Sequence, residues 1–417
     1  MVDFCGDVGE SFVTKRTLVL ILFHSGVVWS VLFTTGFVEF TSGAALLSFI
    51  GAGVGSLGVW SSRRRYPTTG TSWIDRHDRY LLATAHILLL IFSVRVGAHL
   101  AEDLVTPGSS SHYSLWWVVV TTVVVYGVGR APRLIFVGVL TAASVVVAVV
   151  IGWVGWSVVS QGGVNGNHLA TITGQGSSLA MIFRGVAVAA VSFTLIDSVM
   201  VRWRGHDAQK VSVFRPTLIA ITLAVATLAY VMVTAAGSMA SHIPYLFPAI
   251  AEHYSGVSLS RWAEAVPVLL LMTSAAILWR GFQLTTDSPL LRRGVAVAVT
   301  AGVLIPYPEM EVLQIAASLV VVSWLVVTAR TLLRVAENRE PWYEWIPPTC
   351  GAAVSALGLY GVIEEHLSLD QRSGSHHLAQ LVVLLGVVAA MEAFTSRWKR
   401  GGQRPRSVSL GNEGEFE

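Results

Sequence analysis

The sequence predicts an all-α integral membrane protein with about twelve transmembrane helices, and three observations support this. The 417 residues are 53% hydrophobic and only 13% charged, whereas an ordinary soluble domain is about 25% charged. Apolar segments long enough to cross a bilayer follow one another along the chain. Lys and Arg residues gather in every second connection between these segments. The composition excludes a large water-facing domain and gives no indication of nucleic-acid binding.

Hydropathy and turn residues delimit twelve apolar segments, each of which we expect to form one transmembrane helix. They cover residues 17–39, 43–61, 80–98, 114–129, 133–156, 178–201, 216–237, 262–280, 292–306, 310–330, 347–364 and 377–396. The fourth and fifth segments are joined by the short turn "GRAPR", and the ninth and tenth by "IPYPEME". Several Trp residues lie near segment ends, the depth that interfacial indole rings prefer.

The distribution of Lys and Arg predicts that both termini are cytoplasmic. With the N-terminus inside, the inner connections and tails contain 24 of the 28 Lys and Arg residues, and the outer connections contain only Arg261 and Arg372. A miscounted helix would invert every later connection and destroy this separation, so the pattern supports an even number of spans. We therefore expect a multi-pass protein of the cell membrane.

Polar interruptions in the first and sixth segments predict two inverted halves. The first segment contains His24, Ser25 and Gly26, and the sixth contains Arg184 and Gly185. Segments five apart cross the membrane in opposite directions, so matching breaks indicate an inverted repeat in which helices 1 and 6 are discontinuous. The expected parts are an N-terminal segment, two five-helix repeats, two additional helices and a cytoplasmic tail, at residues 1–16, 17–156, 178–330, 347–396 and 397–417.

These features resemble the amino acid–polyamine–organocation (APC) superfamily of transporters with the LeuT-type fold. The stretch "GSMASHIPYLFPAIAEHYSG" is similar to the long outer loop of that fold, and "TTGFVEFTSGAALLSF" resembles a stretch of bacterial YkvI-type membrane proteins. In "LLLMTSAAILW", Thr273 and Ser274 lie midway along the eighth segment, where Na⁺-coupled members carry hydroxyl ligands. The resemblance implies a secondary active transporter that works by alternating access.

The interruptions are the expected substrate-binding residues: His24, Ser25, Gly26, Arg184 and Gly185. The outer half-helix of the first span begins near Gly26, so its amides would favour an anionic group, and Arg184 adds positive charge. An amino acid or related carboxylate is therefore the leading expectation. Structural interpretations stay open: His24 capping a backbone carbonyl, Gly26 allowing close helix packing, and Arg184 reaching the outer headgroups.

Thr273 and Ser274 are the expected ion-binding residues. As a pair facing the break in the first span, they suit oxygen coordination of Na⁺. The alternative ion is H⁺, which His24 could carry, although the fifth span lacks the Lys that can replace the ion in proton-coupled relatives. The structural interpretation is a pair of hydroxyls bonded to carbonyls one turn earlier in the helix. No other metal and no cofactor is expected.

Two other classes of function stay open. One is a membrane sensor or scaffold with a transporter-like fold, and the other is a lipid-linked glycosyltransferase or acyltransferase. Glu102 and Asp103 form an acidic pair that could serve a glycosyltransferase, but the outer connections are short, and neither enzyme class explains breaks five spans apart. We therefore expect no enzyme activity. The expected partners are a small solute and the lipid bilayer. Cys5 and Cys350 show no metal-ligand spacing and no sign of a disulfide.

Overall fold

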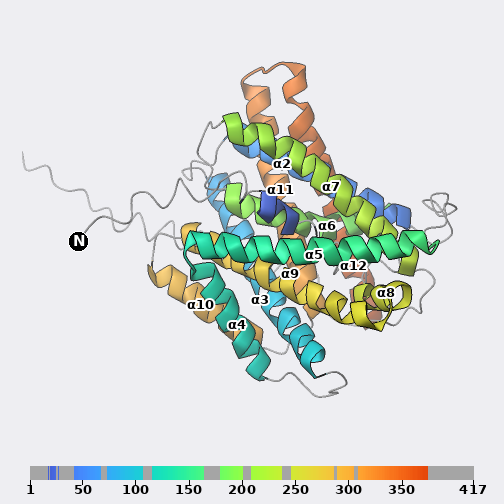
Figure 1. Cartoon of the computed structure of the whole chain (residues 1–417). Helices are drawn as coiled ribbons and strands as arrows, with labels where there is room; N and C mark the ends of the chain where they lie inside the picture. Colours follow the sequence, from blue (N-terminus) through green and yellow to red (C-terminus); the bar gives the residue numbers. More distant parts are fainter. Residues whose placement is uncertain are drawn as a thin grey trace, which may run out of the picture.

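The computed structural model describes residues 42–66, 73–106, 115–163, 179–200, 208–236, 246–285, 289–304 and 309–373, together with Thr17, residues 19–24 and Val27. The helices in Figure 1 are α2 (Ser42–Arg65), α3 (Trp73–Val105), α4 (Leu115–Arg130), α5 (Arg133–Ser160), α6 (Leu179–Met200), α7 (Ala208–Ala236), α8 (Leu246–Ser255), α9 (Val257–Thr285), α10 (Pro289–Leu304), α11 (Glu309–Glu337) and α12 (Ile346–Ser373), with the 3-10 turn η2 (Trp342–Glu344) before α12. Residues 19–24 are also helical.

The described helices coincide with predicted spans two to eleven. Within these residues, seven helices are long and apolar enough to cross a membrane, and α4 and parts of α6 and α10 are shorter apolar helices. The short helix α8 lies in the predicted outer loop between spans seven and eight. The twelfth predicted span and most of the first lie outside the described residues, so the total of twelve spans stays a prediction.

The interruption predicted at Arg184 and Gly185 is wrong, because α6 is continuous from Leu179 to Met200. One glycine inside a helix costs only about 1 kcal/mol relative to alanine, and packing against α2 and α12 supports α6 at this point. The hydroxyl of Ser48 on α2 donates to the Ile182 carbonyl at 3.2 Å. The other predicted break follows His24, but Ser25 and Gly26 lie outside the described residues.

The packing of the helices repeats in the two halves. When each span is matched to the span five later, α3 corresponds to α9, α4 to α10 and α5 to α11. The packing of α4 against α9 then recurs as α10 against α3, and α5 against α9 recurs as α11 against α3. The two corresponding helices α3 and α9 also pack against each other. This is the pattern expected of an inverted repeat with a pseudo-two-fold axis.

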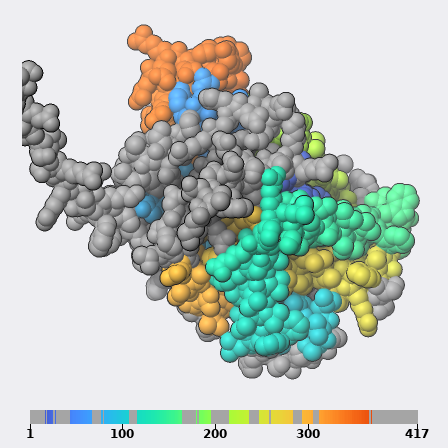
Figure 2. All heavy atoms as spheres, turned by 60° about the vertical axis from the view of Figure 1, so that its left-hand side comes forward, coloured from blue at the N-terminus to red at the C-terminus, as the bar shows by residue number. Residues whose placement is uncertain are grey.

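Helix α12 packs closely into the body of the protein, against α2, α6 and α11. At Gly58 of α2, an added Cβ would lie 2.8 Å from the Cα of Gly351 on α12, and at Gly361 it would lie 2.2 Å from the Arg184 nitrogen. Glycine is therefore required at both crossings. Helices α4 and α5, coloured teal in Figure 2, lie on the surface instead. Their exposed side chains include Trp116, Val123, Leu134, Trp153 and Trp156, which suits contact with lipid.

Candidate polar site between the first, fifth and eighth spans

His24 lies at a buried junction of three spans. Its Nδ1 is 3.1 Å from Thr273 Oγ1 on α9. Its Nε2 is 2.9 Å from Ser144 Oγ and 3.2 Å from the Leu140 carbonyl, both on α5. The side chain of His24 is completely buried. One imidazole ring therefore connects the first and fifth spans with the eighth, across the two predicted halves.

Both hydroxyls at this junction also bond within their own helices. Thr273 donates to the Leu269 carbonyl at 2.7 Å, and Ser144 donates to the Leu140 carbonyl at 2.8 Å. This is the structural interpretation that the sequence left open for Thr273. A neutral imidazole has one N–H and one acceptor nitrogen, so the roles of the two hydroxyls toward His24 depend on its tautomer.

Ser274, next to this junction, has a completely buried hydroxyl with no hydrogen-bond partner among the described residues. A buried polar group without a partner costs about 1–3 kcal/mol. Ser93, Ser192 and Ser255 share this property among the described residues, and Ser274 differs from them in following Thr273, which contacts His24.

The structure brings together only some of the predicted site residues. His24 and Thr273 are in contact, and Ser274 lies beside them. Arg184 is half-buried near the start of α6, where its backbone packs against Gly361 of α12, and Gly185 is buried in the same helix. Sequence reasoning missed Ser144, which with Thr141 is one of two hydroxyls among the valines and alanines of the fifth span.

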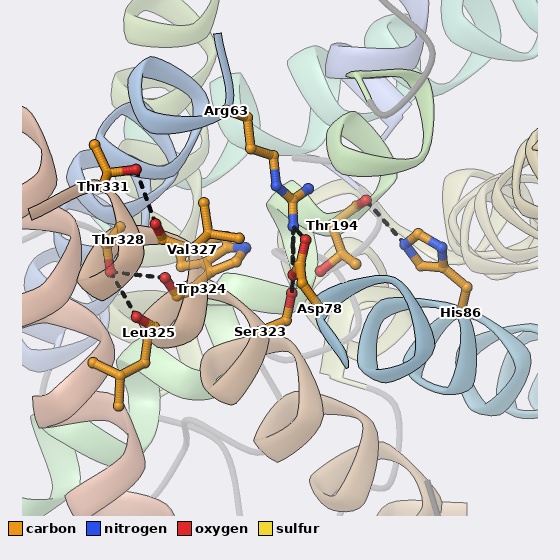
Figure 3. Close-up of polar contacts among 10 residues, drawn as sticks. All are labelled: Arg63, Asp78, His86, Thr194, Ser323, Trp324, Leu325, Val327, Thr328 and Thr331. Atoms are coloured by element: carbon orange, nitrogen blue, oxygen red, sulfur yellow. Dashed lines mark hydrogen bonds and ion pairs between the residues drawn. The ribbon is translucent and has the colours of Figure 1, made fainter. Parts of the chain in front are cut away.

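A second buried cluster joins α2, α3 and α11 (Figure 3). The Nη2 of Arg63 donates to Asp78 Oδ1 at 3.1 Å and to Ser323 Oγ at 3.3 Å, and Ser323 in turn donates to Asp78. The side chains of Arg63 and Asp78 are only 8% and 4% exposed. The sequence indicated Arg63 only as one of the charges that set orientation, so this pair was missed.

His86 on α3 forms a polar contact with α6, also drawn in Figure 3. Its Nε2 lies 3.2 Å from the Thr194 carbonyl. The pair joins spans three and six, which correspond to spans eight and one in the matching of spans five apart. Those are the spans that Thr273 and His24 join. Both interfaces between corresponding spans therefore contain a buried histidine, but both histidines belong to the first half, His24 on span one and His86 on span three.

Metal-binding side chains do not gather in the part of the chain that the structure describes. No group of three or more His, Cys, Asp or Glu residues there could hold a metal ion. The chemistry available at the His24 junction is therefore that of hydroxyls, a carbonyl and an imidazole.

No protein-family model and no curated protein matches the sequence. Solved structures match in fold. One is a mutant of the manganese transporter of Eremococcus coleocola, with a TM-score of 0.51 and 15% identity over 92% of each chain. Another is MhsT in complex with L-phenylalanine, with a TM-score of 0.53 and 12% identity over 83% of this chain and 97% of that chain.

A third similar structure is Mhp1, a nucleobase-cation-symport-1 family transporter in a closed conformation with bromovinylhydantoin bound. Its TM-score is 0.50, with 14% identity over 86% of this chain and 93% of that chain. At identities this low, the similarity shows the fold but does not identify a ligand. Membership of the APC superfamily and the likeness to YkvI-type proteins stay predictions. The protein is a multi-pass membrane protein with the LeuT fold.

Proposed function

We propose that the protein is a secondary active transporter that moves a small organic solute by alternating access, coupled to Na⁺ or H⁺. The observation that carries this proposal is the buried contact of His24 with Thr273 and Ser144, which puts polar groups from both halves of a LeuT fold at one point. The similar solved structures are transporters, which supports the general class of function over an enzyme.

An amino acid or related carboxylate is the proposed solute. MhsT was solved with L-phenylalanine, but Mhp1 with a hydantoin, so the fold alone does not select a solute. The proposal rests on His24, on Ser25 and Gly26 after it, and on Arg184 with Gly185 in α6. A half-helix beginning after the predicted break in the first span would direct its amides at a carboxylate.

A screen of small metabolites by thermal shift, with and without Na⁺, tests the class of solute. Hits are then reconstituted in proteoliposomes under a Na⁺ gradient or a pH gradient. Gradient-driven accumulation is the expected result. Binding without any uptake would favour the sensor or scaffold function instead. Substitution of Arg184 by Gln should weaken binding of a carboxylate hit, and an unchanged affinity would remove Arg184 from the site.

Na⁺ is the proposed ion at Thr273 and Ser274, with H⁺ on His24 as the alternative. The buried hydroxyl of Ser274 has no hydrogen-bond partner among the described residues, which supports an oxygen site there. The double variant Thr273→Ala, Ser274→Ala should lose Na⁺-dependent solute binding while keeping its fold. If Na⁺ still enhances binding in this variant, the ion binds elsewhere. Accumulation driven by a pH gradient alone would assign the coupling to a proton.

We also propose that the protein lies in the cell membrane with both termini cytoplasmic. The carboxyl-terminal end of α2, which carries Arg63, Arg64 and Arg65, then faces the cytoplasm. Labelling of single cysteines placed in the N-terminal and C-terminal tails, in intact cells and in inverted vesicles, tests the orientation. Labelling of either tail from outside the cell would contradict it.

A further inference from the structure

Two arginines converge on one buried tryptophan where α2 and α7 pack together. The Cζ of Arg64 on α2 lies 5.8 Å from the centroid of the Trp60 ring, and the Cζ of Arg215 on α7 lies 5.1 Å from the same centroid. The two guanidinium groups are therefore within about 11 Å of each other. Phe214 stacks on Trp60 with a centroid distance of 4.8 Å and fixes the ring. Both cations are thus held by cation–π contacts to a rigid platform.

Among the described residues, no acid forms an ion pair with either arginine. Arg64 and Arg215 are exposed, and no ion pair involves either of them in the described part of the chain. The neighbours of Arg64 differ: Arg63 is paired with Asp78, and Arg65 with Glu340 and Glu344. Within the part of the chain that the structure describes, the adjacent arginines are paired with acids, whereas Arg64 and Arg215 are exposed to an external anion.

The position of the pair fits the headgroup layer of a membrane. The apolar span of α2 is Gly43–Arg65, and that of α7 is Phe214–Ala235. Arg64 is therefore the last residue but one of the α2 span, and Arg215 is the second residue of the α7 span. Exposed Ile219 and Leu223 follow Arg215 at intervals of four residues, so they lie on the same face of α7, toward the membrane interior.

We propose that Arg64 and Arg215 bind the phosphate group of an anionic phospholipid over Trp60, with its acyl chains along Ile219 and Leu223. Planar guanidinium groups donate paired hydrogen bonds to phosphate oxygens, so two of them suit one phosphodiester. The apolar face below the arginines selects a lipid over a soluble phosphate. Figure 1 shows α7 lying along α2, the arrangement that brings the two cations together.

Native mass spectrometry of the purified full-length protein tests this site, with dioleoylphosphatidylglycerol and dioleoylphosphatidylcholine added at equal concentration. The wild type should retain phosphatidylglycerol preferentially. Each of the changes Arg64→Gln and Arg215→Gln should lower the affinity for it roughly fivefold, the contribution of one cation near a membrane surface. The variant with lysine at both positions should keep only part of the preference, because the charges remain but the paired hydrogen bonds of the guanidinium groups are lost.

Arg293→Gln is the matched control, since Arg293 is another exposed arginine at the start of an apolar helix, Arg293–Leu304. It should leave the preference unchanged. The proposal fails if the double glutamine variant binds phosphatidylglycerol as tightly as the wild type. It also fails if inorganic phosphate or glycerol phosphate displaces the lipid at equal concentration, since the site would then take a soluble anion. Thermal unfolding confirms that each variant is folded.

Discussion

Replacing Asp78 by Asn is expected to destabilise the protein strongly. The change keeps the size of the side chain but removes the charge that balances Arg63, which is 92% buried. Breaking a buried ion pair from one side costs about 3–5 kcal/mol, because the buried charge loses the counter-charge to which it is bonded. The bonds from Arg63 and Ser323 to Asp78 also weaken when the acceptor is neutral.

The free energy of unfolding in detergent, measured by denaturant titration, checks this expectation. Glu344→Gln is the matched control, because the pair of Glu344 with Arg65 is 29% exposed on both sides. Partly exposed pairs contribute only about 0–1 kcal/mol. The double variant Arg63→Met, Asp78→Leu removes both charges and should recover most of the loss. If Asp78→Asn costs no more than Glu344→Gln, the pair does not join α2 to α3 as the structure indicates.

Three further substitutions have defined outcomes. Gly361→Val should prevent α12 from packing on α6, because the added Cβ would meet the backbone of Arg184. The yield of monodisperse protein should therefore fall. Gly138→Ala is the control and should leave the yield unchanged, because no atom lies within 4 Å of the added Cβ. Ser274→Ala should raise the melting temperature without Na⁺, because it removes a buried hydroxyl that has no partner among the described residues. It should also abolish any Na⁺-dependent stabilisation, and a lower melting temperature would show that the hydroxyl is bonded. Ser144→Ala should cost about 0.5–1.5 kcal/mol of unfolding free energy, and no loss would mean that its contact with His24 contributes nothing.

Hydropathy predicts spans two to eleven well, because a lipid-facing helix must be apolar along its whole length. The same reasoning failed at Arg184 and Gly185. A polar residue beside a glycine signals a break only when no neighbouring helix supports the backbone, and here α12 approaches through Gly361. That support comes from a residue more than 170 positions away, so the local sequence gives no sign of it.

The contact of His24 with Thr273 is consistent with the inverted-repeat reasoning, which expected the first and eighth spans to face each other. The other partners were missed for a physical reason. Arg63 follows the apolar part of its helix and looks like an orientation charge, yet a long side chain can turn back and pair with a buried acid. His86 bonds to a backbone carbonyl, a group that every residue has, so no sequence pattern identifies it.

The contact of Gly58 with Gly351 has a practical consequence for following motion. With no side chain between them, the two backbones are in direct contact at this crossing, so we expect α12 to follow displacements of α2. Leu357 of α12 is exposed, whereas most of α2 is enclosed by its neighbours. A spin label or fluorophore at Leu357 would therefore report displacements of α2 from a position that reagents can reach without disturbing the interior.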